Sequence, residues 1–199
     1  MSVEEVAAAL RGGGLALVPT DTVYGLAASA DREGAVRRLY RVKERDESQP
    51  TALVAASVDV LLECIPELRG RAGTIAAALL PGPYTLVLPN PARRYRWLTG
   101  STPEAIGVRV PAVEGPAREL LEAVGILAAS SANPRGGADP PRLEDVPPEF
   151  RALADAELDV GELPGTASTV LDFTGPEPRV LREGAAPSAE ALRRIGSLL

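Results

Sequence analysis

Four polar side chains crowd into the five residues that follow a short apolar run near the N-terminus: Thr20, Asp21, Thr22 and Tyr24. The apolar run predicts a buried strand, so these groups stand where that strand leaves the core. A packed core does not need such a density of hydrogen-bonding groups, which favours a binding site. The alternative is an Asx-type polar turn around Asp21 that joins two strands.

Two further pairs are each separated by one residue: Lys43 with Arg45, and Ser131 with Asn133. In extended backbone, residues i and i+2 point the same way, so each pair can direct two donors at one target. The first pair offers positive charge, and the second offers neutral hydrogen bonding at the end of a buried strand, where α/β proteins tend to bind ligands. The alternative for the second pair is a simple turn before Pro134.

Arg109, Ser168 and Arg182 fall on other predicted strands. An arginine in an apolar strand needs either an acidic partner or a cavity that holds an anion, and both interpretations stay open for Arg109 and Arg182. Together with the pairs above, these groups suit a polyanionic ligand with a small polar partner. Catalysis by positioning and charge stabilisation fits them, as in phosphoryl and nucleotidyl transfer.

The composition excludes several classes of catalytic and metal-binding site. The 199 residues include no histidine, which excludes an imidazole base, a Ser-His-Asp triad and histidine-ligated zinc. A single cysteine, Cys64, excludes an internal disulfide and a thiolate metal cluster and indicates a reducing compartment. The net charge of −6 argues against wholesale capture of nucleic acid. No apolar run approaches the roughly 18 residues that span a bilayer, so we expect a cytoplasmic protein without membrane partners.

The predicted strands and helices that must position these groups alternate irregularly along the chain, and some strands follow one another directly. This predicts an α/β (α+β) fold with a mixed sheet flanked by helices, in one domain over residues 1–199. Predicted strands are 15–19, 25–28, 51–56, 84–88, 106–111, 126–130, 168–173 and 179–182. Predicted helices are a capped one ending near Gly12, then 31–42 with Asp31 as cap, 57–64, 73–80, 116–124 and one capped at Ser188. Residues 92–104 and 135–148 read as loops.

Seven short motifs occur in order along the chain. They are Pro19-Thr20-Asp21-Thr22-Val23-Tyr24-Gly25-Leu26, Lys43-x-Arg45, Pro81-Gly82-Pro83-x-Thr85-Leu86, Val108-Arg109-Val110-Pro111, Ser131-Ala132-Asn133, Ser168-Thr169-Val170 and Val180-Leu181-Arg182-x-Gly184. Together they resemble the YrdC-type threonylcarbamoyl-AMP synthases in their short, single-domain form, over nearly the whole chain.

The resemblance implies a YrdC-like fold, a twisted mixed β-sheet with helices around a concave positive cavity. It also implies a nucleotidyltransferase that converts L-threonine, bicarbonate (or CO2) and ATP to threonylcarbamoyl-AMP and pyrophosphate, with Mg²⁺ carried by ATP and no metal held by protein side chains. A separate tRNA threonylcarbamoyl transferase complex would use the product in tRNA modification.

The resemblance also assigns residue roles. Threonine would be held by Thr22, Arg109 and Ser168. ATP would be held by Lys43, Arg45, Gln49, the backbone at Ala129, Ser131, Asn133 and Arg182. The catalytic residues would be Lys43, Arg45, Ser131 and Asn133, which position substrates and neutralise charge while the carbamate of threonine acts as nucleophile.

The chain departs from the usual family pattern at Asp46, at Thr51-Ala52 and at Pro134-Arg135-Gly136, in the loops expected to contact ATP. Two alternatives therefore stay open. One is a paralogue of the same fold with an unknown nucleotide-dependent substrate. The other is a module that binds double-stranded RNA or tRNA, which would need a continuous arginine surface around residues 37–41 and a steep salt dependence.

Overall fold

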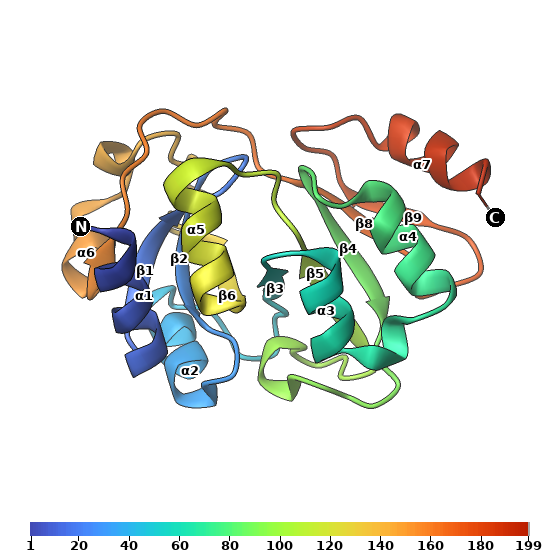
Figure 1. Ribbon diagram of the computed structural model, residues 1–199, viewed down its shortest axis with the longest axis horizontal. Helices are drawn as coiled ribbons and strands as arrows, with labels where there is room; N and C mark the ends of the chain where they lie inside the picture. The colour runs from blue at the N-terminus through green and yellow to red at the C-terminus, as the bar shows by residue number, and fades with distance from the viewer. Residues whose placement is uncertain (199) are drawn as a thin grey trace.

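A computed structural model describes residues 1–198, in which one twisted mixed sheet of nine strands is flanked by helices (Figure 1). The strand order is β7-β1-β2-β6-β3-β5-β4-β8-β9. The strands are β1 (Leu15–Pro19), β2 (Tyr24–Ser29), β3 (Ala52–Ala55), β4 (Tyr84–Pro89), β5 (Ala105–Arg109), β6 (Ile126–Ser131), β7 (Ala156–Glu157), β8 (Thr169–Asp172) and β9 (Arg179–Arg182). The helices are α1 (Val3–Gly12), α2 (Glu33–Val42), α3 (Val58–Cys64), α4 (Arg71–Leu79), α5 (Gly115–Val124), α6 (Pro148–Leu153) and α7 (Ser188–Gly196). The predicted mixed sheet is confirmed.

The sheet mixes antiparallel and parallel neighbours. β1, β2, β6 and β3 form a continuous antiparallel ladder, β5 joins β3 in parallel, and β4 pairs antiparallel with β5. β8 then pairs parallel with β4 and antiparallel with β9. Because side chains alternate between the two faces of a strand, this register determines which residues from distant parts of the chain share a face.

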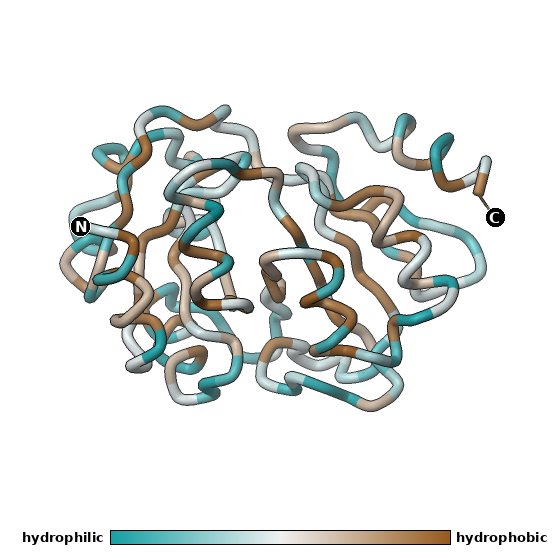
Figure 2. The backbone as a smooth tube through the Cα atoms, viewed as in Figure 1, coloured by the Kyte–Doolittle hydropathy of each residue, from teal (hydrophilic) through white to brown (hydrophobic). Residues whose placement is uncertain are grey.

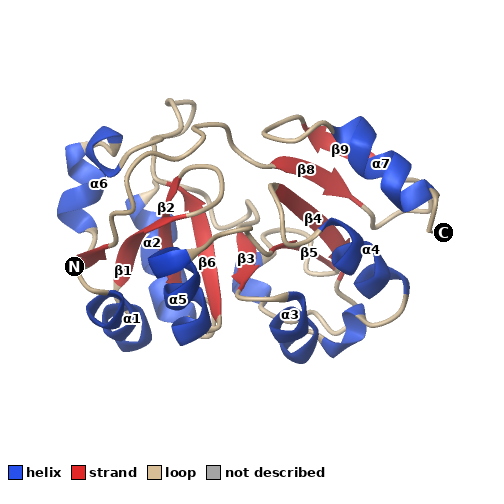
Figure 3. Ribbon diagram, turned by 45° about the horizontal axis from the view of Figure 1, so that its top comes forward, coloured by secondary structure: helices blue, strands red, loops and turns tan. Residues whose placement is uncertain are grey.

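Two hydrophobic clusters cover the sheet. On one face, apolar residues of α2 such as Leu39 pack with Leu26 and Leu53, and the same cluster continues to Leu61 of α3 and Leu79 of α4. On the other face, the apolar sides of α1 and α5 pack together over β1, β2 and β6. Figure 3 shows α2 behind that end of the sheet and α1 and α5 in front of it. Figure 2 shows the hydrophobic colour concentrated along the strands and the inner helix faces.

Two helix starts differ from the prediction. The predicted cap Asp31 does not cap α2, which begins at Glu33 after Arg32 with no side-chain cap bond. The Asp31 carboxylate instead accepts a hydrogen bond from the Tyr95 hydroxyl at 3.3 Å. Ser188 is the first residue of α7, not its cap, because its hydroxyl donates to the carboxylate of Glu183. In both cases the side chain that was expected to cap the helix forms a hydrogen bond with a residue outside the helix instead.

The segment predicted as a loop over residues 135–148 is followed by two short elements that the sequence did not reveal. α6 starts at Pro148, and the two-residue strand β7 extends the sheet beside β1. Two residues are too few to show an alternating pattern, so β7 has no periodic signal. Within residues 1–198, none of the helices has the length and apolarity needed to cross a bilayer.

Candidate active site

A cavity of about 330 Å³ lies on the sheet face opposite α2. Its floor is a row of residues that strand register makes neighbours, several of them without bulky side chains. The neighbouring pairs are Gly25 with Ser131, Ala129 with Ala52, Val54 with Arg109, Val87 with Gly107 and Thr85 with Val170. Because several of these side chains are small, they leave open space next to the polar groups at the strand ends.

Arg109 ends β5 beside the cavity, and its side chain is only 10% exposed. Its Nη2 donates to the Thr22 hydroxyl at 2.7 Å and to the carboxylate of Asp21. The other oxygen of Asp21 accepts from the backbone N–H of Ala112 at 2.9 Å. The ion-pair interpretation of Arg109 is therefore right, but Nη1 has no partner among residues 1–198. Asp21 thus holds the guanidinium in place and leaves one edge of it for a ligand.

The turn after β1 is made by Thr20. Its Oγ1 donates to the carbonyl of Val23 at 2.8 Å and accepts from the backbone N–H groups of Thr22 and Val23, each at 3.2 Å. Thr20 lines the cavity, whereas Thr22 is fully buried with its hydroxyl between Thr20 and Arg109. The turn alternative is thus correct in part, although Thr20 and not Asp21 closes the turn. The geometry places Thr22 behind the cavity, where it orients Arg109.

Arg182 ends β9 on the far side of the cavity. Its Nε and Nη2 donate to the backbone carbonyl of Ser168 at 3.1 and 2.7 Å, and no acidic partner lies within ion-pair distance among residues 1–198. The ion-pair interpretation of Arg182 is therefore wrong. Gly184 makes the approach possible, because a Cβ there would overlap the carbonyl oxygens of Ala167 and Ser168. This explains the glycine of the last motif.

Arg45 supplies a third guanidinium to the same cavity. Its Nη2 donates to the carbonyl of Pro50 at 2.5 Å, and its Nη1 lies 3.5 Å from the hydroxyl of Ser130. Burial lowers the pKa of Arg45 from its ordinary value, although an arginine still carries its charge at neutral pH. With Arg109 and Arg182, the cavity therefore presents three cationic side chains from three separate parts of the chain.

Lys43 holds the end of β6 in place. Its Nζ donates to the carbonyl of Ser131 at 2.7 Å and to the carbonyl of Asn133, and it lies 3.5 Å from Asn133 Oδ1. Burial, followed by the neighbouring charge of Arg45, lowers the pKa of Lys43 to about 8. An ammonium has three N–H groups, so these three oxygens account for all its donors. In this conformation Lys43 positions the ligand-binding segment.

The extended geometry predicted for Lys43 and Arg45 is wrong. Lys43 closes α2, and Glu44 has a φ of 47°, in the left-handed region. The backbone therefore turns between the two residues, yet both side chains still reach the end of β6, Lys43 at Ser131 and Arg45 at Ser130. The convergence that the sequence predicted is real, but a tight turn produces it.

Asn133 shapes the loop after β6. Its Oδ1 accepts from the Ser131 hydroxyl at 2.6 Å, and its Nδ2 donates to the carbonyl of Gly137 at 2.7 Å. The turn interpretation therefore fits Asn133, while Ser131 and Ala129 line the cavity. The backbone carbonyl of Gln49 accepts from the Tyr40 hydroxyl at 2.8 Å, and Gln49 is absent from the described lining. The predicted residues thus divide into those that line the cavity and those that support it.

Five polar residues of the lining were not among the predicted site residues: Thr20, Thr51, Thr85, Thr102 and Ser130. A signal existed for Thr85, because it lies on the face of a predicted strand opposite Leu86, which is fully buried. Ser130 precedes Ser131 on the strand and carried no pattern that distinguished it.

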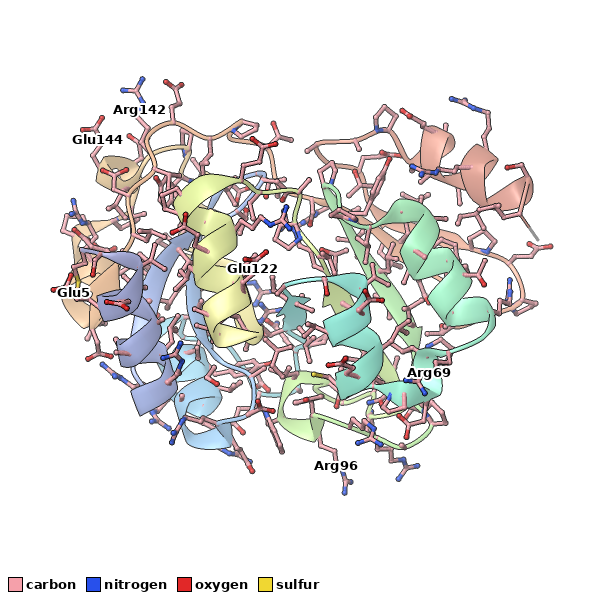
Figure 4. The ribbon with its side chains drawn as sticks, in the orientation of Figure 1. Glu5, Arg69, Arg96, Glu122, Arg142 and Glu144 are labelled. Carbon is pink, nitrogen blue, oxygen red and sulfur yellow. The ribbon has the colours of Figure 1, made fainter. Side chains whose placement is uncertain are left out.

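Two of the surface arginines of α2 are paired with acids. Arg37 contacts Glu33 and Glu47, and Arg38 contacts Asp155 at 2.5 Å. Elsewhere Arg142 contacts Glu144, and Figure 4 shows both at the same edge of the molecule. These pairs interrupt the continuous positive surface that an RNA-binding module would need.

Sequence comparison identifies the family. A family model described as "Telomere recombination", for Sua5, YciO and YrdC proteins, matches residues 8–184. The chain belongs to the Sua5/YciO/YrdC family. Two relatives of this family member are the threonylcarbamoyl-AMP synthase of Pyrococcus abyssi, 35% identical over 190 residues, and a putative threonylcarbamoyl-AMP synthase of Mycobacterium leprae, 31% identical over 195 residues. The matches cover 95% and 98% of this chain, but 56% and 88% of the relatives, so the chain spans little more than half of the Pyrococcus protein.

Solved structures agree with the family assignment. Pyrococcus abyssi Sua5 complexed with L-threonine matches 98% of this chain and 57% of its own length, with a TM-score of 0.88 and 36% identity. Escherichia coli YciO matches 93% of this chain and 90% of its own length, with a TM-score of 0.82. Because YciO is 24% identical, that likeness shows the YrdC-like fold alone.

Proposed function

We propose that this family member is an L-threonylcarbamoyladenylate synthase, a nucleotidyltransferase that joins L-threonine, bicarbonate and ATP and releases pyrophosphate. The observation that carries the proposal is the convergence of Arg45, Arg109 and Arg182 on one cavity with a floor of small residues. Three fixed guanidinium groups suit substrates that bring a carboxylate and a triphosphate. The curated relatives named as threonylcarbamoyl-AMP synthases, and the relative solved with L-threonine, support the same substrates.

The arginines of the cavity suit different substrates. Arg109 offers Nη1 to a carboxylate, held in position by Asp21 and Thr22, which fits the carboxylate of threonine. Arg45 and Arg182 suit the phosphates and would neutralise the charge that develops as pyrophosphate leaves. Ser131 and Ala129 of β6 also line the cavity, where they would contact ATP. The reacting nucleophile would be the carbamate of threonine, so no protein nucleophile is required.

Mg²⁺ would enter with ATP. Within residues 1–198 no group of three His, Cys, Asp or Glu side chains is arranged to hold a metal ion, and the described cavity lining contains hydroxyl and guanidinium groups without a carboxylate. This donor set fits an anion and does not fit a bare divalent cation. Mg²⁺ would therefore be held by the phosphate oxygens, where it supplies additional charge neutralisation.

The test is pyrophosphate release from ATP, with L-threonine and bicarbonate each omitted in turn. We expect release that requires both, and threonylcarbamoyl-AMP as the co-product by mass spectrometry. Release that persists without L-threonine but needs another small acid would instead support a paralogue with a different substrate. A wild-type chain that binds ATP and releases no pyrophosphate under any of these conditions would exclude the synthase activity.

A further inference from the structure

Thr85 of β4 lines the cavity, but none of the roles above uses it. Its hydroxyl lies 2.8 Å from the hydroxyl of Ser168, and Ser168 Oγ lies 3.3 Å from Nη2 of Arg182. Three polar groups from three strands or strand ends thus form a chain of hydrogen bonds along the cavity wall.

Strand register determines this arrangement. Thr85 pairs with Val170 of β8, and Val170 pairs with Arg182 of β9. The side chains of Thr85, Val170 and Arg182 therefore share one face of the sheet. Ser168 immediately precedes β8 and is only 4% exposed. Because these positions depend on the ladder of the sheet and not on a flexible loop, the hydroxyl of Thr85 is held at a defined point of the cavity.

The protons in this chain can be counted. A guanidinium only donates, so Ser168 Oγ must accept from Arg182. The bond between the two hydroxyls uses one of their two protons. One O–H therefore remains, with no other partner among residues 1–198. An unused donor in a partly buried cavity of this kind suits a ligand atom that accepts a hydrogen bond.

The guanidinium also sets the direction of the chain. A hydroxyl that accepts from a cation becomes a stronger donor, so the favoured order runs from Arg182 to Ser168 to Thr85. The unused O–H then belongs to Thr85. We propose that Thr85 is a ligand-binding residue whose hydroxyl, at the end of this relay, donates to an anionic oxygen of the substrate. The identity of that oxygen, in the carboxylate of threonine or in a phosphate of ATP, rests on the proposed function.

The first experiment compares Thr85→Val, which removes the hydroxyl and keeps the shape, with Thr85→Ser, which keeps the hydroxyl. For Thr85→Val we expect kcat/KM to fall about tenfold to hundredfold, the range for a hydrogen bond to a charged group, with an unchanged thermal unfolding midpoint. Thr85→Ser should remain within about threefold of wild type. Wild-type kinetics for Thr85→Val, or equal losses for both variants, would overturn the proposal.

Thr74→Val is the matched control, because Thr74 is exposed on α4 and its hydroxyl donates to the carbonyl of Gly70 at 3.2 Å. It should leave kcat/KM unchanged.

A second experiment combines Thr85→Val with Ser168→Ala. If Thr85 acts through the relay, the combined loss is smaller than the product of the two single losses. Losses that multiply would show that Thr85 acts independently of Ser168 and would refute the relay.

Binding measurements separate this proposal from the proposed reaction. Calorimetric titration of wild type and Thr85→Val with ATP alone, and with L-threonine alone, shows which substrate loses affinity and so which anionic oxygen Thr85 contacts. A wild-type chain that binds these ligands without releasing pyrophosphate would refute the reaction while Thr85 is still judged by affinity. Unchanged affinity of Thr85→Val for both ligands, together with unchanged kinetics, would refute the role of Thr85 alone.

Discussion

Lys43 is a charged residue whose partial burial disfavours its charge. It is the single lysine among 21 basic residues, and it lies half-buried with its ammonium directed at oxygens that end β6. A compact ammonium with three donors suits this arrangement better than a planar guanidinium does. Burial lowers the pKa of Lys43 to about 8, so its charge is lost within an accessible pH range.

We therefore predict that affinity for ATP falls as the pH rises through about 8, because deprotonation removes a positive charge from the site. Conformational stability should change in the opposite direction. The pKa of this lysine is higher in the unfolded chain, so between pH 8 and about 10.4 the unfolded chain binds more protons and the contribution of Lys43 to stability rises with pH.

The measurements are calorimetric ATP affinity and urea unfolding between pH 6.5 and 9.5, each compared with Lys43→Met. The variant should lose the pH step in affinity and give a difference in unfolding free energy that varies with pH. Parallel pH profiles for the two proteins would show that another group is responsible.

At the scale of the elements, the glycine of β5, Gly107, leaves space in the cavity that a side chain would fill. A Cβ added at Gly107 would lie 3.7 Å from Ala52 Cα and 3.9 Å from Thr85 Cγ2, which are ordinary contacts. The fold therefore has room for a larger residue there, and the backbone needs no special conformation. The space above Gly107 belongs to the cavity, so a glycine at this point serves the ligand.

We predict that Gly107→Val keeps or slightly raises the unfolding midpoint, because valine favours strands, and lowers ATP or threonine affinity at least tenfold by filling the cavity. Gly34→Ala is the control, since a Cβ at that position of α2 meets nothing within 4 Å. It should leave affinity unchanged. A Gly107→Val protein that unfolds readily would show that the glycine is needed for folding instead.

The extent to which sequence predicted structure also differs from element to element. The apolar runs located β1 and β6 closely, because buried strands bounded by glycine or proline carry a strong signal. The turn at Glu44 and the two residues of β7 carried none. For the site, the motifs include residues that line one cavity, among them Arg45 and Arg109, but motif order could not separate Thr20, which lines the cavity, from Thr22 behind it. That distinction depends on a local hydrogen-bond pattern that spacing does not encode.

At the scale of the whole molecule, the distribution of charge bears on nucleic acid. The net charge is −6, and the arginines of α2 are partly neutralised by Glu33, Glu47 and Asp155. Three further arginines, Arg45, Arg109 and Arg182, line a cavity of about 330 Å³, which is too small for a duplex. Small anions can use this charge, whereas a phosphate backbone cannot follow it along the surface.

We predict that micromolar protein forms no complex with tRNA at 150 mM salt, and that any binding at low salt has a shallow salt dependence, since few phosphates are contacted. Fluorescence anisotropy with labelled tRNA between 50 and 200 mM salt measures both. A double-stranded RNA of equal length serves as the comparison for sequence-independent binding. A steep salt slope with retained affinity at 150 mM would support the RNA-binding alternative.

The register of the sheet has one further consequence. Gly25, Ala52, Gly107 and Ala129 come from four distant parts of the chain and meet only because their strands pair as they do. A slip of one residue in any of these pairings would send that strand's contribution to the opposite face. Such a chain would lose the cavity while keeping most of its strand content, so for preparations of this protein ligand affinity is a stricter criterion of correct refolding than spectroscopic strand content.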